Sequence, residues 1–255
     1  AIDSNHAISL TNLGGLFVQQ KKYADAAALF IKVVAMSPKL PEVHYNLGSA
    51  LYELGDLEAA LRCFNHALQL NEKFDLAYIY KGNALIGLHR YDEAVTAYDT
   101  ALQLNPKRGE TYFSRGNAYK KMREYRAAMT DFMHAIEYRP DFAKAYWNLG
   151  LMLLVLGELE QGWKLHEWRW KLPELGLKQH HFSQPLWLGE ENIIGKHLFI
   201  CDEQGIGDKI QMMRYAPILA NLGVQVSIEV PRPLLQLAES LGPHVTVIAE
   251  GGRPS

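Results

Sequence analysis

Small and apolar side chains recur along the first two-thirds of the chain at a constant interval of 34 residues. The segments NLGGLF, NLGSAL, YKGNAL, SRGNAY and NLGLML begin at residues 12, 46, 80, 114 and 148 and lie in one register. When units are counted from residues 7, 41, 75, 109 and 143, position 8 is always glycine. Position 20 is alanine and position 24 is aromatic in the first four units. The pattern predicts a series of similar structural units.

The spacing of these positions predicts two short helices in each unit. Small residues at positions 8 and 20 let the two helix backbones approach closely, and the ring at position 24 fills the space between neighbouring hairpins. Pro38, Pro106 and Pro140 close three of the units, because proline cannot continue a helix. The fifth unit has Gly162 and His166 where the others have alanine and a ring, which predicts an adaptor.

This period and these residue types resemble the tetratricopeptide repeat. The resemblance covers residues 7 to about 170 and implies a superhelix within residues 1–171, with repeats at 7–40, 41–74, 75–108, 109–142 and 143–171. In such a superhelix the first helices line a concave groove that takes a partner. Amides and aromatic rings dominate the positions that the resemblance assigns to this groove: Asn12, Tyr45, Asn46, Tyr52, Tyr80, Asn83, Phe113, Asn117, Trp147 and Asn148.

These groove residues predict binding of a protein or an extended peptide. An amide side chain both donates to and accepts from a peptide backbone, and a ring adds contact area at low entropic cost. Any one of the rings is equally well explained by packing within its hairpin. Lys120, Lys121 and Lys144 are scattered among acidic residues, so a clamp for a C-terminal carboxylate is not predicted.

The segment from residue 158 to 171, ELEQGWKLHEWRWK, continues as a helix that carries Trp163, Trp168 and Trp170. We expect the three indoles to seal the last repeat and dock the following domain rather than to stack on a ligand. Residues 172–195 then form a linker. It contains His180 and His181, but no further residue has the spacing of a metal ligand, so no metal site is predicted.

The pattern changes from residue 196, where apolar strand-like runs alternate with helical segments up to residue 255. The runs HLFIC, VQVSIEV and VTVIA are separated by a helix from Asp208 to about Leu222 and by LLQLAES. Strand, helix, strand, helix, strand predicts a parallel sheet. The expected fold class is therefore mainly α, with a tetratricopeptide solenoid followed by a partial, Rossmann-like α/β domain.

The turn after the first strand, EQGIGD, offers two chemistries at the carboxyl end of the sheet, where ligands bind in such folds. Gly205, Gly207 and Glu229 fit a dinucleotide fingerprint, whereas Ile210 stands where its third glycine belongs. Alternatively, Asp208 caps the helix and takes a proton from a sugar hydroxyl, although a helix cap with no further role explains this residue equally well. Gln204, Gly205 and Gly207 would then bind the acceptor.

The sequence x-x-G-I-G-D after a strand resembles the opening of heptosyltransferases and other glycosyltransferases with two Rossmann domains. That resemblance implies that Asp208 is a candidate base and that Gly207 lies in the acceptor cleft. The fusion as a whole is similar to bacterial glycosyltransferase-like proteins with tetratricopeptide repeats. It resembles the O-linked N-acetylglucosamine transferases more loosely, through an asparagine ladder of Asn12, Asn46 and Asn148 that Tyr80 and Ser114 interrupt.

The size of the chain limits what this resemblance implies. Such enzymes bind their sugar nucleotide largely on a second domain, so we expect these residues alone to be catalytically silent and to carry no cofactor. A sugar nucleotide is expected only for a full-length parent. Two alternatives stay open: a pure interaction scaffold with an α/β cap and no chemistry, and a dinucleotide-binding protein that Ile210 disfavours.

Composition narrows the classes of partner. The 26 basic and 28 acidic side chains nearly cancel, which argues against a nucleic-acid partner. Cys63 and Cys201 lie in different kinds of segment and do not suggest a disulfide framework, which favours a cytoplasmic protein. No uninterrupted apolar run is long enough for membrane insertion. Self-association is a further expectation.

Overall fold

The computed structural model describes residues 4–177, 182, 184–201 and 205–251, and it divides after Leu172 into two units. We call residues 1–172 the repeat unit and residues 173–255 the α/β unit. The described residues confirm the expected fold class, because helices predominate and a small parallel sheet follows them. Each unit is described by itself.

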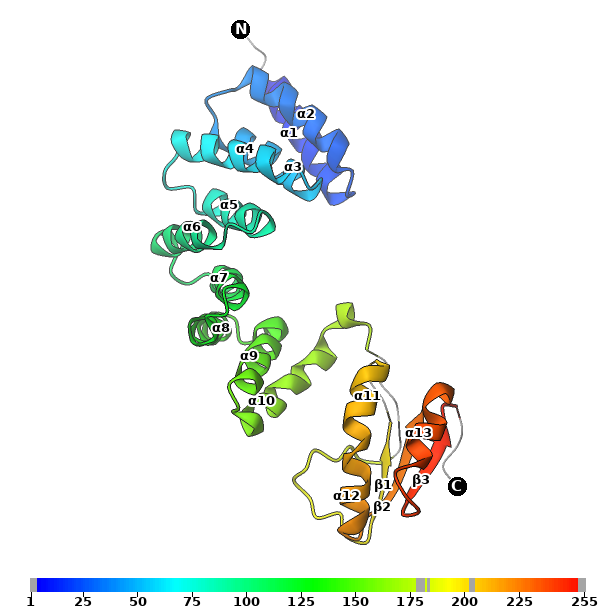
Figure 1. The fold of residues 1–255 in the computed structure, drawn as a ribbon. Helices are drawn as coiled ribbons and strands as arrows, with labels where there is room; N and C mark the ends of the chain where they lie inside the picture. Colours follow the sequence, from blue (N-terminus) through cyan, green and yellow to red (C-terminus); the bar gives the residue numbers. More distant parts are fainter. Residues whose placement is uncertain (1–3, 178–181, 183, 202–204, 252–255) are drawn as a thin grey trace. The chain divides into compact units, whose positions relative to one another are not determined.

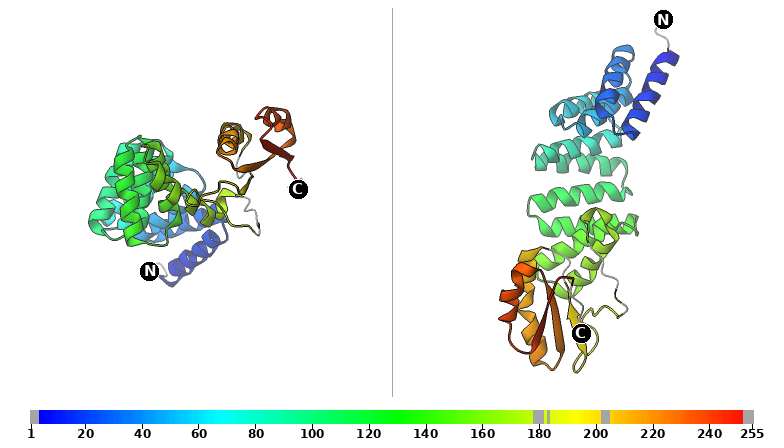
Figure 2. Two further views of the ribbon diagram at one scale, coloured as in Figure 1. Left: turned by 90° about the horizontal axis from the view of Figure 1, so that it is seen from below. Right: turned by 90° about the vertical axis from the view of Figure 1, so that its right-hand side faces the viewer.

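The repeat unit is a stack of antiparallel helix pairs (Figures 1 and 2). Each helix contacts the one before it and the one after it. The helices are α1 (Ser4–Gln19), α2 (Tyr23–Met36), α3 (Pro41–Glu53), α4 (Leu57–Leu70), α5 (Asp75–Gly87), α6 (Tyr91–Leu104), α7 (Gly109–Lys121), α8 (Tyr125–Tyr138), α9 (Ala143–Val155) and α10 (Leu159–His166), followed by the 3-10 helix η1 (Glu167–Lys171).

The recurring glycine packs against the recurring ring of its own pair. A Cβ added at Gly14 would lie 2.5 Å from Phe30 Cε1, and one at Gly48 would lie 2.7 Å from Phe64 Cε1. Gly82 and Gly116 have the same relation to Tyr98 and Phe132. The Phe64 ring also belongs to a buried cluster with Ala84 of the next pair, so one ring joins two pairs. This confirms the close helix packing that the period predicts.

The two helices of the fifth pair also pack closely, although this pair has no aromatic ring at position 24. A Cβ at Gly150 would meet the backbone of Gly162 and His166 at 3.0 and 2.9 Å. Because both helices carry glycine at the crossing, α9 and α10 pack backbone to backbone. The η1 segment then covers this pair, where Trp168 stacks on Tyr146 with ring centroids 3.9 Å apart. The expectation that an indole of this segment seals the last repeat is confirmed for Trp168.

A left-handed residue at position 15 ends the first helix of every pair. Gly55 and Gly157 occupy it with φ of 86° and 87°. Lys21, His89 and Arg123 occupy the same position with φ of 58° to 63°, a conformation that costs energy for residues other than glycine. The tight turn is therefore a constant of the repeat, although its residue type is not.

Charged groups join the third and fourth pairs. Arg115 on α7 donates two hydrogen bonds to the buried carboxylate of Asp131 on α8, at 2.6 and 2.8 Å. Its third nitrogen donates to Asp99 on α6 at 2.5 Å. We call this three-helix network the Arg115 clasp. Burial lowers the pKa of Arg115 and the two carboxylates raise it, and the net direction is upward.

The α/β unit contains a parallel sheet in the order β1 (His197–Ile200), β2 (Gln225–Val230), β3 (Val245–Ala249). Its helices are α11 (Ile206–Met213), α12 (Tyr215–Asn221) and α13 (Leu235–Glu239), with short 3-10 turns η2 (Pro173–Leu175) and η3 (Arg232–Leu234). The helix expected from Asp208 to Leu222 thus starts two residues earlier and divides at Arg214.

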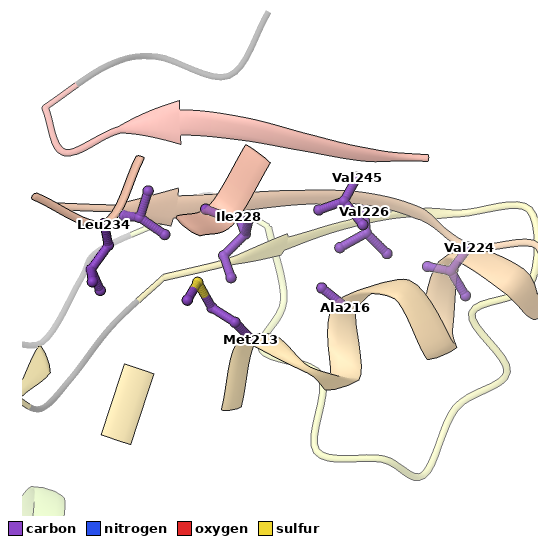
Figure 3. Packing of buried hydrophobic residues seen from close by; sticks show 9 residues of the cluster. Met213, Ala216, Val224, Val226, Ile228, Leu234 and Val245 are labelled. Atoms are coloured by element: carbon purple, nitrogen blue, oxygen red, sulfur yellow. The ribbon is translucent and has the colours of Figure 1, made fainter. Parts of the chain in front are cut away.

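One face of β2 builds the core of this unit. Val226, Ile228 and Val230 are buried and pack with Met213 and Ala216 from the α11–α12 layer (Figure 3). The alternate residues Ser227 and Glu229 are also buried and polar. The Ser227 hydroxyl lies 2.7 Å from His197 Nε2, so a hydrogen bond joins β2 to β1 on the second face of the strand.

Candidate functional site

The first helices of the pairs form one side of the repeat unit. The helix α5 contacts α3 and α7, its counterparts in the neighbouring pairs. Five asparagines occupy position 6 or 9 of the first helices, two positions that are neighbours on a helix surface, and four of the five lie on α1, α3, α5 and α7. We call these four the amide row: Asn12, Asn46, Asn83 and Asn117. Asn12 is exposed and the other three are half-buried.

Most of the amide row is not used by the fold. Among the described residues, the side chains of Asn12, Asn46 and Asn117 have no hydrogen-bond partner within the chain. The carbonyl oxygen of Asn83 accepts a 2.7 Å hydrogen bond from the Tyr98 hydroxyl, which leaves its NH2 group available. The signal for that bond was in the sequence, because Tyr98 stands where the other first four units have phenylalanine. The row thus presents both donors and acceptors.

Asn148 does not belong to this free row, which corrects the expected ladder. It is 4% exposed, and its NH2 group donates to the carbonyl of Lys144 at 2.9 Å. Its carbonyl accepts from the ammonium of Lys120 on α7. Burial, followed by the charge of Lys121, lowers the pKa of Lys120. The Asn148 amide therefore ties α7 to α9, a role that only the tertiary contact reveals.

The rings at position 5 mainly close their own pairs. Tyr45 lies 5.0 Å from Phe74, and Phe113 lies 4.7 Å from Phe142, with nearly equal interplanar angles of 47° and 48°. The packing alternative thus accounts for both rings, although each keeps a half-exposed edge.

Tyrosines extend this packing between the second and third pairs. Tyr80 meets Tyr45 and Tyr52 edge-on, with centroids 5.4 and 6.1 Å apart. Burial raises the pKa of Tyr45 and of Tyr52, and nearby tyrosine and acidic groups add to it. Both hydroxyls therefore stay protonated at neutral pH and can donate hydrogen bonds.

Of the three rings at position 5, Trp147 has the fewest contacts with other rings of the described residues. Its pair has His166 and Gly176 at the positions where the second and fourth pairs have rings, so no ring of the described chain contacts the indole. The indole N–H is buried and meets no acceptor among the described residues. The side chain as a whole is half-exposed.

The turn before α11 is the second candidate site. Gly205 is the N-cap residue, with extended φ and ψ of −66° and 167°. Asp208 lies in the first turn of the helix and is not its cap, which corrects the prediction. A Cβ at Gly205 or Gly207 would meet no atom within 4 Å, so the backbone there is open. Gln204 lies outside the described residues.

The other two positions of the dinucleotide fingerprint, Ile210 and Glu229, do not face the turn as that fingerprint requires. Ile210 is 45% exposed, so the position where the fingerprint needs tight helix packing faces outward. The carboxylate of Glu229 accepts a 3.0 Å hydrogen bond from the Gly251 N–H and ties β2 to the segment after β3. Among the described residues, no group of three or more side chains that could hold a metal comes together. His180 and His181 lie outside those residues.

Comparison with protein families identifies the repeats. The family described as tetratricopeptide repeat matches residues 41–74 and, in a second form, residues 109–142. The family described as TPR repeat matches residues 14–55 and 82–122. Residues 14–74 and 82–142 of the repeat unit therefore match tetratricopeptide repeats. No helix of the described residues is both long and apolar enough to span a bilayer.

Solved structures share this fold. The MamA chain from residue 41 onward of Desulfovibrio magneticus RS-1 is 22% identical with a TM-score of 0.58, over 69% of this chain and 97% of that one. YrrB, whose structure is described as a TPR protein with an unusual peptide-binding site, is 20% identical with a TM-score of 0.54, over 66% and 87%. TTC0263, a thermophilic TPR protein in Thermus thermophilus, is 19% identical with a TM-score of 0.56, over 66% and 92%.

A curated relative matches a shorter stretch. Protein FlbA of Caulobacter vibrioides is 33% identical over 101 residues, which is 38% of this chain. The match spans 17% of the length of FlbA.

Proposed function

We propose that the first-helix face of the repeat unit binds an extended segment of a protein partner. The observation that carries the proposal is the amide row, in which Asn12, Asn46 and Asn117 lie on first helices with no partner inside the described chain. A half-buried amide that the fold does not use is a cost unless a ligand or water satisfies it. The backbone of an extended peptide supplies both a donor and an acceptor at each residue.

The rings beside the amide row set the character of this face. Burial raises the pKa of Tyr52, whose hydroxyl stays neutral beside the Tyr80 ring, and Trp147 presents a ring that no other ring of the described chain covers. Rings and amides without a concentration of one charge favour backbone recognition over the reading of a charged motif. The peptide-binding site in the description of YrrB is that protein's own property, and the shared fold makes it a model for this proposal.

The test is replacement of Asn12, Asn46 and Asn117 together by alanine. Peptides are first selected on the unchanged chain from a random library displayed on phage, then labelled and titrated by fluorescence anisotropy. Each lost hydrogen bond is worth about 1 kcal/mol, so the loss of three amounts to about 3 kcal/mol and we expect the triple variant to bind the selected peptides roughly a hundredfold more weakly. Helical circular dichroism should not change.

Two controls separate binding from folding. Asn65→Ala removes a half-buried amide from the second helix α4 and should leave peptide affinity unchanged. Asn148→Ala removes the hydrogen bonds that join α7 to α9, so it should lower the free energy of unfolding, which the triple variant should not do. Unchanged affinity in the triple variant would show that the amide row is not the binding surface.

We also propose that the α/β unit derives from a glycosyltransferase-type domain whose parent uses a sugar nucleotide. The parallel order β1-β2-β3 and the open glycines before Asp208 support this assignment. These residues alone are proposed to be silent, and Asp208 to act only in a full-length parent. Calorimetric titration with UDP-glucose and UDP-N-acetylglucosamine tests whether these residues bind a sugar nucleotide. A Kd tighter than about 1 mM would contradict the proposal that they are inactive alone.

A pure scaffold is the second candidate for the parent. It is supported by Glu229, whose carboxylate is tied to the fold by the Gly251 N–H instead of facing a ligand. Asp208→Asn in the full-length parent distinguishes the two candidates. If the parent is a glycosyltransferase, the substitution should abolish sugar transfer; if it is a scaffold, partner binding should stay unchanged. A fluorescence titration with NADH tests the dinucleotide alternative. A cytoplasmic location and the lack of a nucleic-acid partner stay predictions from composition.

A further inference from the structure

One place on the first-helix face brings a residue at position 12 of one pair against a residue at position 6 of the next pair. On α7 and α9 these residues are Lys120 and Asn148, and the Lys120 ammonium donates a hydrogen bond to the carbonyl oxygen of the Asn148 side chain. On α3 and α5 they are Tyr52 and Tyr80, whose rings meet edge to face with their planes at 84°. The same place in the repeat thus holds a cation of the chain in one pair of helices and two rings in another.

The two tyrosines form a partly open corner, which we call the tyrosine corner. Their ring centroids lie 6.1 Å apart, and both side chains are half-exposed. In the fourth pair the chain covers such rings itself, because the Arg115 guanidinium lies 5.5 Å from the Tyr112 centroid and 5.9 Å from that of Tyr119. Among the residues that the structure describes, no Lys or Arg lies over the ring of Tyr52 or Tyr80.

A carboxylate lies beside the tyrosine corner. Glu53 follows Tyr52 on α3 and is exposed. It accepts a hydrogen bond from the neutral Tyr23 hydroxyl and forms no ion pair within the described parts of the chain.

Glu53 makes the potential at the corner negative. Burial raises the pKa of Tyr52, and the charge of Glu53 and the nearby Tyr80 raise it further. Burial opposes a charge of either sign, whereas the influence of Glu53 opposes only a negative charge and favours a positive one. The faces of the two rings are also electronegative. The corner therefore has the surroundings that attract a cation.

We propose that the tyrosine corner binds a Lys or Arg side chain of the extended segment that the amide row holds. This inference rests on the proposed function and adds a property of the partner, namely a basic residue at one fixed place in the segment. The ring faces attract the cation and Glu53 supplies the opposite charge. An acidic side chain at this place would be repelled, and an apolar one would gain nothing from Glu53.

The corner lies within the amide row. Asn46 on α3 has the same position in its repeat as Tyr80 on α5, and Asn83 lies one turn after Tyr80. The amides alone cannot fix the register of a peptide, because each of them can donate to or accept from any residue of the backbone. A basic side chain in the corner fixes that register.

Peptides selected on the unchanged chain provide the test. We expect them to share a Lys or Arg at one position of their alignment. Replacing that residue by norleucine, which has a straight side chain without charge, should weaken binding about threefold to thirtyfold. This change leaves the protein untouched, so its effect cannot come from misfolding.

Matched variants of the chain locate the effect at the corner. Tyr52→Leu should weaken the basic peptides about threefold to tenfold and the norleucine peptides less than about twofold. Tyr52→Phe keeps the ring and should retain the affinity, whereas Glu53→Gln should weaken only the basic peptides, by about twofold to fivefold. Tyr138→Leu on α8 removes a ring that is 37% exposed, and it should bind every peptide like the unchanged chain. Circular dichroism checks the fold of each variant.

The outcomes separate this inference from the proposed function. Selected peptides that share no basic residue, or that bind equally well with norleucine, would overturn the inference and leave peptide binding by the amide row standing. Equal losses for basic and norleucine peptides in Tyr52→Leu would also overturn it, because the ring would then supply only apolar contact. If the selection yields no peptide at all, the proposed function fails and this inference fails with it.

Discussion

Adjacent glycines in α1 separate the packing role of glycine from its effect on the helix. Gly14 and Gly15 both lie inside the helix Ser4–Gln19. Replacing a helix-interior glycine by alanine stabilises the helix by about 0.5 to 1 kcal/mol, because alanine loses less backbone entropy. A Cβ at Gly15 would meet no atom within 4 Å, so Gly15→Ala should gain that amount in full.

Gly14→Ala has the same gain in helix propensity but meets a ring. Its Cβ would lie 2.5 and 2.8 Å from Phe30 Cε1 and Cζ, whereas carbon atoms in contact are separated by about 3.5 to 4.0 Å. Phe30 is 3% exposed and packed in a cluster with Ala26 and Leu47, so the ring cannot move about 1 Å without displacing its neighbours. Overpacking of this kind costs about 1 to 3 kcal/mol.

The expected separation between the two variants is therefore about 1 to 3 kcal/mol, with Gly15→Ala the more stable. Urea unfolding followed by circular dichroism measures the stability of the whole unit, and amide hydrogen exchange in α1 and α2 measures the local opening of the first pair. Equal stability of the two variants would refute the assignment of position 8 to ring packing.

Further predictions follow from the backbone, the clasp and the tyrosines. Arg123→Gly should raise stability by about 0.5 to 1 kcal/mol and Gly55→Ala should lower it by about 1 kcal/mol, since both positions are left-handed; urea midpoints check this. Asp131→Asn should lower the free energy of unfolding by about 2 to 3 kcal/mol, because the largely buried Arg115 guanidinium then has one carboxylate partner fewer. A decrease of less than about 1 kcal/mol, the usual value for a surface ion pair, would contradict the clasp. Burial raises the pKa of Tyr45 and Tyr98 above the ordinary value of 10.0, so stability is fully present below pH 10 and should fall as pH rises beyond it; unfolding at several alkaline pH values, with tyrosinate absorbance as the second readout, tests the sign.

The sequence carried enough information for the architecture of the repeat unit because its packing is local. Each ring lies against a glycine sixteen residues earlier, so the pattern that a reader sees in the sequence is also a contact in space. The three strands were equally accessible, since buried parallel strands appear as short apolar runs. The left-handed position 15 was hidden because Lys21, His89 and Arg123 share no side-chain type with Gly55.

The candidate site was less accessible to prediction, because the availability of a polar group depends on its neighbours. Asn46 and Asn148 occupy the same position of the repeat, yet only Asn148 has both ends of its amide bound. The difference comes from Lys120, which lies 28 residues before Asn148, whereas the residue at the same distance before Asn46 is Val18 and has no polar group to offer. Asp208 was misassigned as a cap for a related reason, since Gly205 had equal claim to the N-cap and only the backbone decides.

The Arg115 clasp adds an ion pair to the apolar packing at one joint of the repeat unit. The contact of Arg115 with Asp99 crosses from the third pair to the fourth, and the Asp99 side chain is 44% exposed. Mobile ions screen an exposed charge pair far more than they affect an apolar contact. Rising ionic strength should therefore loosen the stack at this joint and leave the apolar joints as firm as before, so the surrounding electrolyte sets how far the solenoid bends there.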